Sequence, residues 1–359
     1  MQIQIPQYQV LANIGCGSQH LVYLAKQIQN SETYAIKIEK KPRIGQLENE
    51  IDILKRLNGV EGIPQIKETG VTREGKVFLI LPLLYKNLLE LRKQIKFSNW
   101  FIMRIGLRMI EILEQLHNKN ILHLDIKPEN IMICQEFKNE YDILKSGFIQ
   151  LIDFGLSQQY QENSESLQDI FIGSFNFASR SSHYGQPLGF KDDLESLLYV
   201  LLYLKDLTLP WSNKQYQGFY NLDFEQIKKS KFNFFKTMIL QQKSSNHLSQ
   251  FISYIDQLNH HVLPDYQYIK QLFKQMIQES NHQFYYFKQD QQQSFCTPTQ
   301  SYKEDSNIQK ISNYENFDEI LLDHKSYRSE KSEKTIILVS NLVVKYNTQQ
   351  IKSIKDIKY

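Results

Sequence analysis

The chain has 359 residues, of which 41% are hydrophobic, enough for one large or two ordinary domains with a substantial core. Its 42 basic and 39 acidic residues leave a net charge of +3, too small to favour nonspecific binding to nucleic acid. Three scattered cysteines argue against a disulfide framework or a metal cluster and indicate a reducing compartment. No secretion signal is recognisable, and the longest apolar run, residues 194–204, is shorter than the about 20 residues that cross a bilayer. We therefore expect a soluble protein of the cytoplasm or the nucleus that binds no membrane.

Short β-type runs separated by turns occupy about the first ninety residues and predict a small β-rich lobe. One helix is expected among them, over residues 45–59. Its apolar Leu47, Ile51 and Leu54 recur at spacings of three and four residues, as on one face of a helix, and Gly59 ends it.

Helical patterns dominate the chain beyond a linker near residues 82–86. A long helix is predicted from about 98 to 120, with Ser98 as its N-cap, and further helices from 190 to about 280. Short strands are expected to carry the intervening loops. The pattern predicts an α+β fold with a small β-rich lobe and a larger α-helical lobe.

The composition changes after about residue 288, where polar residues replace large apolar ones. We expect residues 289–359 to form a disordered tail, because such a segment cannot bury enough apolar surface to fold alone. Residues 335–346, TIILVSNLVVKY, are apolar enough for a strand or a docking segment. The preferred interpretation is a weakly ordered tail with one apolar patch.

Four motifs carry the functional signal, and the first is a glycine turn. In IGCGSQHLVY, residues 14–23, Gly15 and Gly17 lie between two expected strands. Glycine allows the backbone to approach phosphate oxygens closely and to offer them N–H donors. Such turns also join many hairpins that bind no ligand, so this motif is weak by itself.

The second motif places Lys37 on a strand, twenty residues after Gly17. A lysine in this setting usually lies on a solvated face, but a carboxylate on the following helix could pair with it. Glu50 is the preferred partner and Glu48 the rival, because the apolar register puts Glu50 nearer the edge of the buried stripe. Such a pair would hold the ammonium over the α- and β-phosphates of a nucleotide.

The third and fourth motifs supply a base and metal ligands. In HLDIKPENIMI, residues 123–133, Asp125 can accept the proton of an attacking hydroxyl, and Lys127 can neutralise charge on a transferring phosphoryl group. Asn130 offers a carbonyl oxygen to Mg²⁺, and Asp153 of LIDFGLS would link that metal to the β- and γ-phosphates. Each motif is common, but the four in this order form a strong signal.

These motifs make the sequence resemble the eukaryotic protein kinases, and within them the casein kinase 1 family. The narrower resemblance depends on GVEGIP (59–64), GSFNFASRSSHYG (173–185), KDDLESLLYVLLYL (191–204), LPW (209–211) and LPDYQYIKQLF (263–273). It covers about residues 8–288 and implies a bilobal kinase fold, with an N-lobe over about 8–82 and a C-lobe over about 87–288.

The resemblance also implies an ATP-binding cleft between the lobes. The loop that would cover the phosphates contains Ile14, Gly15, Cys16, Gly17, Ser18, Gln19, His20, Leu21 and Val22, with Lys37 and Glu50 facing it. Adenine would lie between Val22 and Ala35 above and Met132 and Ile152 below, with Leu83 and Leu84 at its edge and Leu81 at the back. Asp125 and Lys127 are the expected catalytic residues, and Asn130 and Asp153 the expected Mg²⁺ ligands.

Three positions depart from the family's pattern. Pro82 replaces a glutamate in the linker but keeps the carbonyl that adenine would use. His20 replaces the third glycine of the loop, and its side chain would loosen the cover over the γ-phosphate and slow catalysis without abolishing it. Leu124 replaces an arginine that in many kinases receives a phosphate on the activation loop. Its loss removes a switch but leaves the base and the metal ligands in place.

The substrate groove departs as well. The family carries further basic residues there, which are thought to read phosphorylated or acidic residues upstream of the target. This sequence instead has Gln158, Asp169 and Asn176, with Lys231 as the candidate for the one basic residue retained. We therefore expect a weakened preference for pre-phosphorylated substrates. The expected partners are proteins with Ser/Thr acceptors, and the expected state is a monomer.

The leading interpretation is an active serine/threonine protein kinase that uses Mg·ATP. The alternative is a catalytically impaired pseudokinase that acts as a binding scaffold, which His20, Pro82, Leu124 and the thinned basic groove would allow. A kinase for small molecules or lipids would share the metal chemistry but not the GSFNFAS and LPDY segments.

Overall fold

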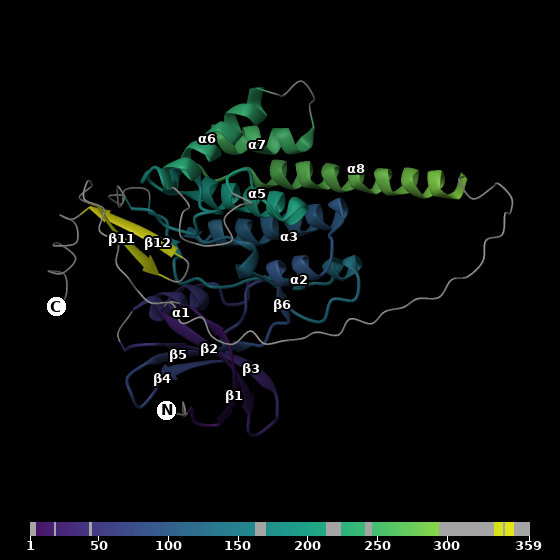
Figure 1. Ribbon diagram of the computed structural model, residues 1–359. Helices are drawn as coiled ribbons and strands as arrows, with labels where there is room; N and C mark the ends of the chain where they lie inside the picture. The colour runs from purple at the N-terminus through teal and green to yellow at the C-terminus, as the bar shows by residue number, and fades with distance from the viewer. Residues whose placement is uncertain are drawn as a thin grey trace, which may run out of the picture.

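The structure, a computed structural model, describes residues 5–17, 19–42, 45–161, 170–212, 224–240, 246–293, 334–339 and 342–347. Figure 1 shows two lobes, a small one built on a β-sheet in purple and blue and a larger one built of helices in blue to green. The chain passes between them in the segment that joins β5 (Val77–Pro82) to β6 (Lys86–Asn87). That segment coincides with the linker predicted from the sequence.

The small lobe is a five-stranded antiparallel sheet with the order β1-β2-β3-β5-β4. Its other strands are β1 (Tyr8–Cys16), β2 (His20–Gln27), β3 (Thr33–Glu39) and β4 (Glu68–Val71). Ile36 and Ile38 of β3 are buried with Phe78 and Ile80 of β5 on one face of the sheet. Because side chains alternate along a strand, Lys37 points to the opposite face.

Helix α1 (Gln46–Arg56) contacts β5 and lies on the face to which Lys37 points. It begins after Gly45, and its Leu47, Ile51 and Leu54 are buried in the main core. The predicted helix and its apolar face are therefore confirmed. Glu50 on the same helix is buried, whereas Glu48 is exposed.

The larger lobe begins with α2 (Leu88–Gln94) and α3 (Asn99–His117). Ser98 caps α3 as predicted, since its hydroxyl oxygen accepts the N–H of Phe101 at 3.1 Å. The helix ends slightly before the predicted end near residue 120. It packs against both α5 (Phe190–Asp206) and α8 (Tyr266–Gln293), so it lies at the centre of the lobe.

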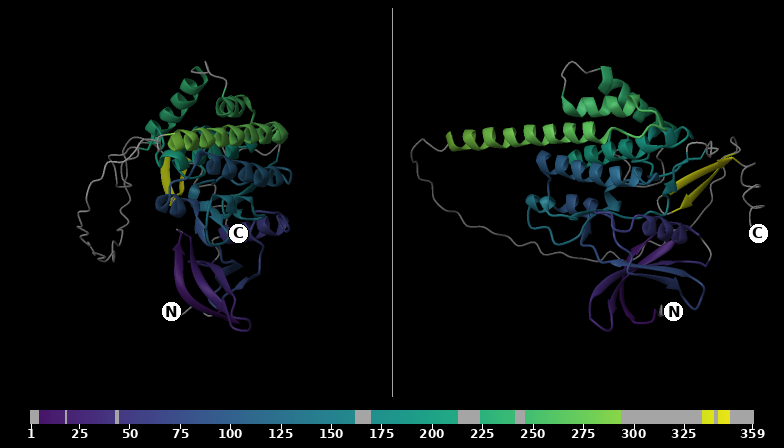
Figure 2. Two further views of the ribbon diagram at one scale, coloured as in Figure 1. Left: turned by 90° about the vertical axis from the view of Figure 1, so that its right-hand side faces the viewer. Right: turned by 180° about the vertical axis from the view of Figure 1, so that it is seen from behind.

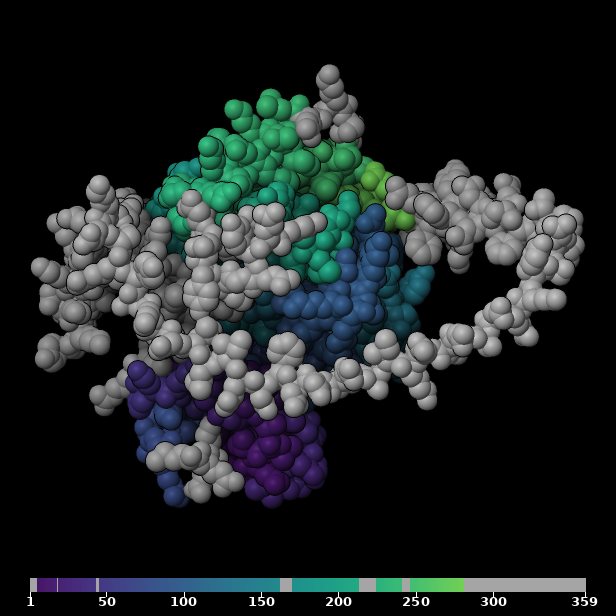
Figure 3. Space-filling model, viewed as in Figure 1, coloured from purple at the N-terminus to yellow at the C-terminus, as the bar shows by residue number. Residues whose placement is uncertain are grey.

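The remaining helices are α4 (Arg180–His183), α6 (Phe224–Leu240) and α7 (His247–Gln257). Figure 2 shows α8 alongside α3, with α6 and α7 on the side away from the small lobe. In the space-filling view of Figure 3 the two lobes are again distinct, with the small lobe in purple. The end of α8 at Gln293 lies beyond residue 288, where the sequence predicts that the domain ends.

Short strands between α3 and α5 carry the loops nearest to the small lobe. β7 (Ile121–Leu122) pairs with β10 (Gln158–Gln159), and β8 (Ile131–Ile133) pairs with β6 and β9 (Ile149–Leu151). Two 3-10 turns, η1 (Pro128–Asn130) and η2 (Glu140–Leu144), lie among them. Because β8 begins where β9 ends, the loop 123–130 and Asp153 leave neighbouring strands at one edge of this small sheet.

Two strands are described after α8, β11 (Lys334–Val339) and β12 (Leu342–Asn347), and they form an antiparallel hairpin. Residues 335–339 and 342–346 thus lie in strands, one of the structures considered for this segment. The expectation of a disordered tail stays a prediction for residues 294–333, 340–341 and 348–359, which lie outside the described residues. No helix within the described ranges is long and apolar enough to cross a membrane.

Candidate active site

Lys37 lies on β3 with its side chain buried between the sheet and α1. Its Nζ is 2.6 Å from Oε2 of Glu50 and 2.8 Å from Oδ1 of Asp153. The predicted pairing of Lys37 with Glu50 rather than Glu48 is therefore confirmed. Burial opposes the charge on the ammonium, but attraction to Asp153 and Glu50 outweighs it and raises the pKa of Lys37.

Asp153 follows β9 and reaches Lys37 from the larger lobe. Its φ of +66° lies in the left-handed region, a strain of about 1–3 kcal/mol that residues other than glycine rarely carry outside functional sites. Burial would raise the pKa of its carboxyl, but the charge of Lys37 outweighs burial and holds that pKa well below the usual range. The next residue, Phe154, is fully buried and meets the ring of His123 edge-on, which fixes the backbone on which Asp153 lies.

Asp125 lies in the loop 123–130, where its carboxylate is buried and accepts hydrogen bonds from three side chains. Lys127 donates to Oδ2 at 2.7 Å, the hydroxyl of Ser174 donates to Oδ1 at 2.8 Å, and Nδ2 of Asn130 donates to Oδ2 at 3.1 Å. Lys127 also donates to the Ser174 hydroxyl oxygen at 3.1 Å. The carboxylate is thus held in one orientation, as a group that accepts a proton from a positioned substrate requires.

A buried polar chain supports the backbone of this loop. Asp193 of α5 accepts the N–H groups of His123 and Leu124, both at 2.8 Å, and lies 3.0 Å from Nε2 of His117 on α3. The hydroxyl of Tyr266 on α8 bonds the other ring nitrogen of His117. These bonds offset the strain at Leu124, whose φ is +65°. Three helices therefore fix the conformation of the loop that carries Asp125.

The side chain of Leu124 is buried with Leu122 and Phe190 in a small apolar cluster. Leucine therefore supplies packing at the position where the sequence indicates that a phosphate-binding arginine has been lost. The loss does not disturb the loop, because Asp193 binds the backbone of Leu124 rather than its side chain.

Asn130 and Asp153 fit a divalent-cation site. Nδ2 of Asn130 donates to the backbone oxygen of Asp125 at 2.9 Å, so the carbonyl oxygen is the end of the amide that would ligate a metal. Mg²⁺ prefers such oxygen ligands and is commonly bound by one or two carboxylates together with substrate phosphates. Within the part of the chain that the structure describes, no three His, Cys, Asp or Glu side chains form a metal cluster.

The residues expected around adenine come from both lobes and from the connection. Val22 and Ala35 lie on β2 and β3, Leu81 on β5, Met132 on β8, Ile152 just after β9, and Leu83 and Leu84 between β5 and β6. All of these residues are half-buried except Leu83, which is exposed. The neighbouring Pro82 is exposed as well. Partial burial leaves a part of each of these side chains accessible to a ligand.

The β1–β2 turn closes through a hydrogen bond from the N–H of Gly17 to the oxygen of His20 at 2.9 Å. The imidazole of His20 is buried, 8% exposed, and a Cβ added to Gly17 would lie 3.0 Å from its Nε2. Burial, together with repulsion from Lys37, lowers the pKa of His20 to about 4, so the ring is neutral at pH 7. His20 thus occupies space beneath the glycine turn.

The other described residues of this turn are less buried than His20. Ile14 and Cys16 are exposed, and Gly15, Gln19 and Leu21 are half-buried. Ser18 lies outside the described residues.

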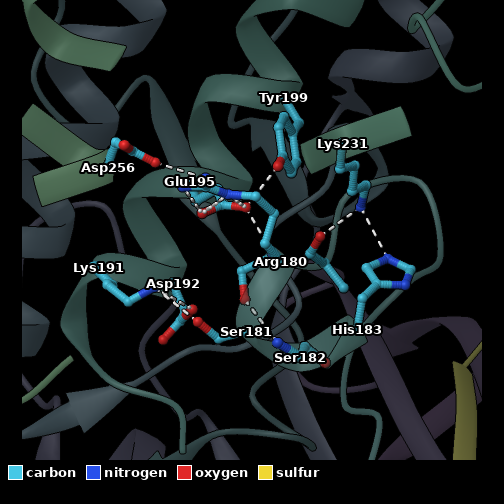
Figure 4. Close-up of polar contacts among 12 residues, drawn as sticks. Arg180, Ser181, Ser182, His183, Lys191, Asp192, Glu195, Tyr199, Lys231 and Asp256 are labelled. Atoms are coloured by element: carbon cyan, nitrogen blue, oxygen red, sulfur yellow. Dashed lines mark hydrogen bonds and ion pairs between the residues drawn. The ribbon is translucent and has the colours of Figure 1, made fainter. Parts of the chain in front are cut away.

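The structure corrects the expectation that Lys231 is a basic residue of the substrate groove. Its side chain is fully buried behind residues 173–185, so its ammonium cannot bind an anion at the surface (Figure 4). Gln158 is exposed and Asn176 is half-buried, and neither carries a charge. Asp169 lies outside the described residues. Of these four positions, the three that are described present no cation to solvent.

Two residues of the site, Ser174 and Asp193, were not predicted from the sequence. Ser174 lies in GSFNFAS, a segment used in the sequence analysis only for the family resemblance. Its hydroxyl bonds Asp125, which is 49 residues away in the sequence. Asp193 could have been found, because Asp192, Asp193 and Glu195 interrupt an otherwise apolar helix. Buried carboxylates need partners, so such an interruption indicates a polar contact.

A comparison with protein families agrees with this geometry. The family model described as "protein kinase domain" matches residues 8–351 of the chain. The matched range contains both lobes and every residue of the site described above. It also extends beyond α8 through the hairpin of β11 and β12, farther than the resemblance seen in the sequence.

Proposed function

The chain belongs to the protein kinase family, whose members transfer phosphate from ATP, with a divalent metal, to proteins, and on that premise we propose that it is an active serine/threonine protein kinase of the casein kinase 1 type. The observation that carries the proposal is the Asp125 carboxylate, held by Lys127 and Ser174. A lysine two residues after the base favours serine and threonine acceptors. We also propose that the protein acts as a monomer in the cytoplasm or the nucleus.

The proposed reaction is an in-line transfer of the γ-phosphoryl group. The acceptor hydroxyl gives its proton to Asp125 and forms a bond to the γ-phosphorus, while the bond from that phosphorus to the bridging oxygen breaks and ADP leaves. Lys127, held against Asp125 at 2.7 Å, balances negative charge on the transferring group.

The other charged residues would hold the nucleotide. Lys37, fixed by Glu50, would bind the α- and β-phosphates. Asn130 and Asp153 would bind Mg²⁺, which when bound neutralises charge on the phosphates. The residues proposed for adenine and the glycine turn remain those named from the sequence.

A phosphate-transfer assay tests the proposal. The purified chain is incubated with γ-labelled ATP, Mg²⁺ and casein, beside an Asp153→Asn variant. We expect label on serine and threonine with the wild-type chain and almost none with the variant, which lacks a metal-binding carboxylate. Equal labelling by both, at background, would exclude an active kinase and favour the scaffold alternative.

His20 is the observation that most favours the scaffold alternative, because its buried ring lies where the glycine turn would cover the phosphates. If the chain is an active kinase, His20→Gly is expected to raise kcat about three- to tenfold, a gain of about 1 kcal/mol in transition-state stabilisation. The measurement is kcat at saturating Mg·ATP, with His261→Gly at an exposed position as the control. A folded His20→Gly variant with unchanged or lower kcat would show that the imidazole does not hinder transfer.

Substrate preference follows from the absence of a solvent-facing cation at Gln158, Asn176 and Lys231. We expect a phosphoserine three residues before the target serine to raise kcat/KM less than about tenfold, which corresponds to about 1.4 kcal/mol. Paired peptides that differ only in that phosphate provide the measurement. A tenfold or larger gain would mean that other cations read the priming phosphate.

A further inference from the structure

Lys231 of α6 is a fully buried lysine whose ammonium faces the Ser174 segment, residues 173–185. Its Nζ donates to the backbone oxygen of Phe175 at 3.0 Å and to that of Ala178 at 2.5 Å, and it lies 3.1 Å from Nε2 of His183. An ammonium has three N–H donors. Two backbone oxygens and one ring nitrogen of a single segment thus surround it, as Figure 4 shows for Lys231 and His183.

Two aromatic rings complete the surroundings of this ammonium. Nζ of Lys231 lies 4.7 Å from the centre of the Tyr199 ring and 5.2 Å from that of Trp211. Ring faces attract cations, so they offset part of the cost of burial. Burial nevertheless lowers the pKa of Lys231. A neutral amine would still have two N–H donors for the two backbone oxygens, so the contact with the segment does not depend on the charge.

The two backbone oxygens belong to the turn that carries Ser174. The oxygen of Ser174 accepts the N–H of Phe177 at 3.0 Å and that of Ala178 at 2.7 Å, which closes the turn. The hydroxyl of Ser174 donates to Asp125. The side-chain nitrogen of Lys231 therefore binds the turn at both Phe175 and Ala178. The first of these residues directly follows Ser174, which orients Asp125, the proposed base.

We propose that Lys231 is a positioning residue for the phosphoacceptor. Its buried side-chain nitrogen fixes the turn from Ser174 to Ala178 and thereby the surface against which an acceptor peptide lies beside Asp125. This inference rests on the proposed kinase activity. It assigns Lys231 to the shape of the acceptor site and not to the binding of a phosphate on the substrate.

Lys231→Met tests the inference, because methionine fills a similar volume without the donors. The control is Lys236→Met, on the exposed side of the same helix. We expect Lys231→Met to lower kcat/KM for a serine peptide at least tenfold while KM for ATP changes less than twofold, and Lys236→Met to change neither by more than twofold. Hydrogen exchange at the amides of Phe177 and Ala178 should become faster in Lys231→Met alone.

A folded Lys231→Met variant with wild-type kcat/KM for the peptide would overturn the inference. If Lys231→Met does not fold, Lys231→Ala is to be prepared with propylammonium chloride, which can enter the vacated space. Recovery of folding and of peptide phosphorylation with propylammonium, and not with sodium at equal ionic strength, is expected; no recovery would also overturn the inference. A wild-type chain that phosphorylates no peptide would contradict the proposed function instead, while the exchange rates would still report on Lys231.

Discussion

The Asp125→Asn variant is expected to transfer phosphate about 10³-fold more slowly than the wild-type chain at saturating Mg·ATP. An amide cannot accept the proton of the acceptor hydroxyl, and loss of a general base typically costs about 10²–10⁴-fold in rate. Asparagine has nearly the shape of aspartate, so KM for ATP should change by less than about threefold. Initial rates with a serine peptide, measured over a range of ATP concentrations, give both quantities.

The control for Asp125→Asn is Asp52→Asn, which makes the same chemical change on the exposed surface of α1. Asp52→Asn should leave the rate within about twofold of the wild-type value, as expected for a surface residue without a buried partner. If Asp125→Asn keeps more than about a tenth of the wild-type rate, Asp125 is not the base, and the contacts with Lys127 and Ser174 have another purpose.

The second large effect is expected on stability, from the ion pair of Arg180 with Glu195 (Figure 4). Nε of Arg180 lies 3.2 Å from both oxygens of Glu195, Nη1 lies 2.7 Å from Oδ1 of Asp256, and the guanidinium lies over the ring of Phe235. Glu195 is fully buried and also accepts the hydroxyl of Tyr199 at 2.6 Å. Arg180→Met would leave this carboxylate buried without its cation.

We expect Arg180→Met to lower the free energy of unfolding by about 3–5 kcal/mol at pH 7, the usual cost of removing one partner of a buried ion pair. Urea unfolding gives the value. Adding Glu195→Gln should recover part of the loss, because the buried charge is then absent. Asp256→Asn, at the more exposed end of the network, should cost less than about 1 kcal/mol. A loss below about 1 kcal/mol for Arg180→Met would contradict this interpretation.

The same ion pair predicts a dependence on pH. Burial would raise the pKa of Glu195, but Arg180 outweighs it and lowers that pKa. A carboxyl group whose pKa is lower in the folded protein stabilises the fold at pH values above its pKa in the unfolded chain, about 4.3 for glutamate. This stabilisation is lost as the pH falls through the pKa of the folded protein. In the Arg180→Met variant, protonation of the buried Glu195 would instead stabilise the folded protein, because it removes an unpaired buried charge. The difference in stability between the two proteins should therefore narrow as the pH falls from 7 toward 4.

Local patterns predicted much of the fold and the pairing of Lys37 with Glu50. The spacing of Leu47, Ile51 and Leu54 placed the first helix and oriented Glu50, which is how its pairing with Lys37 could be inferred. Ser98 marked the start of α3, because an N-cap acts within three residues. Such interactions join neighbours in the sequence, and their periodicity is visible without a structure.

Contacts between distant segments were not predictable in the same way. Lys231 was taken for a surface cation because charge alone says nothing of burial, and its partners lie 48 to 56 residues away. Ser174 reaches Asp125, and Tyr266 reaches His117, only after the helices have packed. Their positions depend on tertiary packing, which no short sequence pattern encodes.

The most direct test of the proposed kinase activity is the initial rate at which the purified wild-type chain transfers the γ-phosphate of Mg·ATP to a serine or threonine peptide. We expect turnover on the order of 1–100 s⁻¹ with an optimal peptide, with the phosphate on the hydroxyl side chain. A rate that does not exceed that of Asp125→Asn at any concentration of ATP or magnesium, with any acceptor peptide, would contradict the proposed activity.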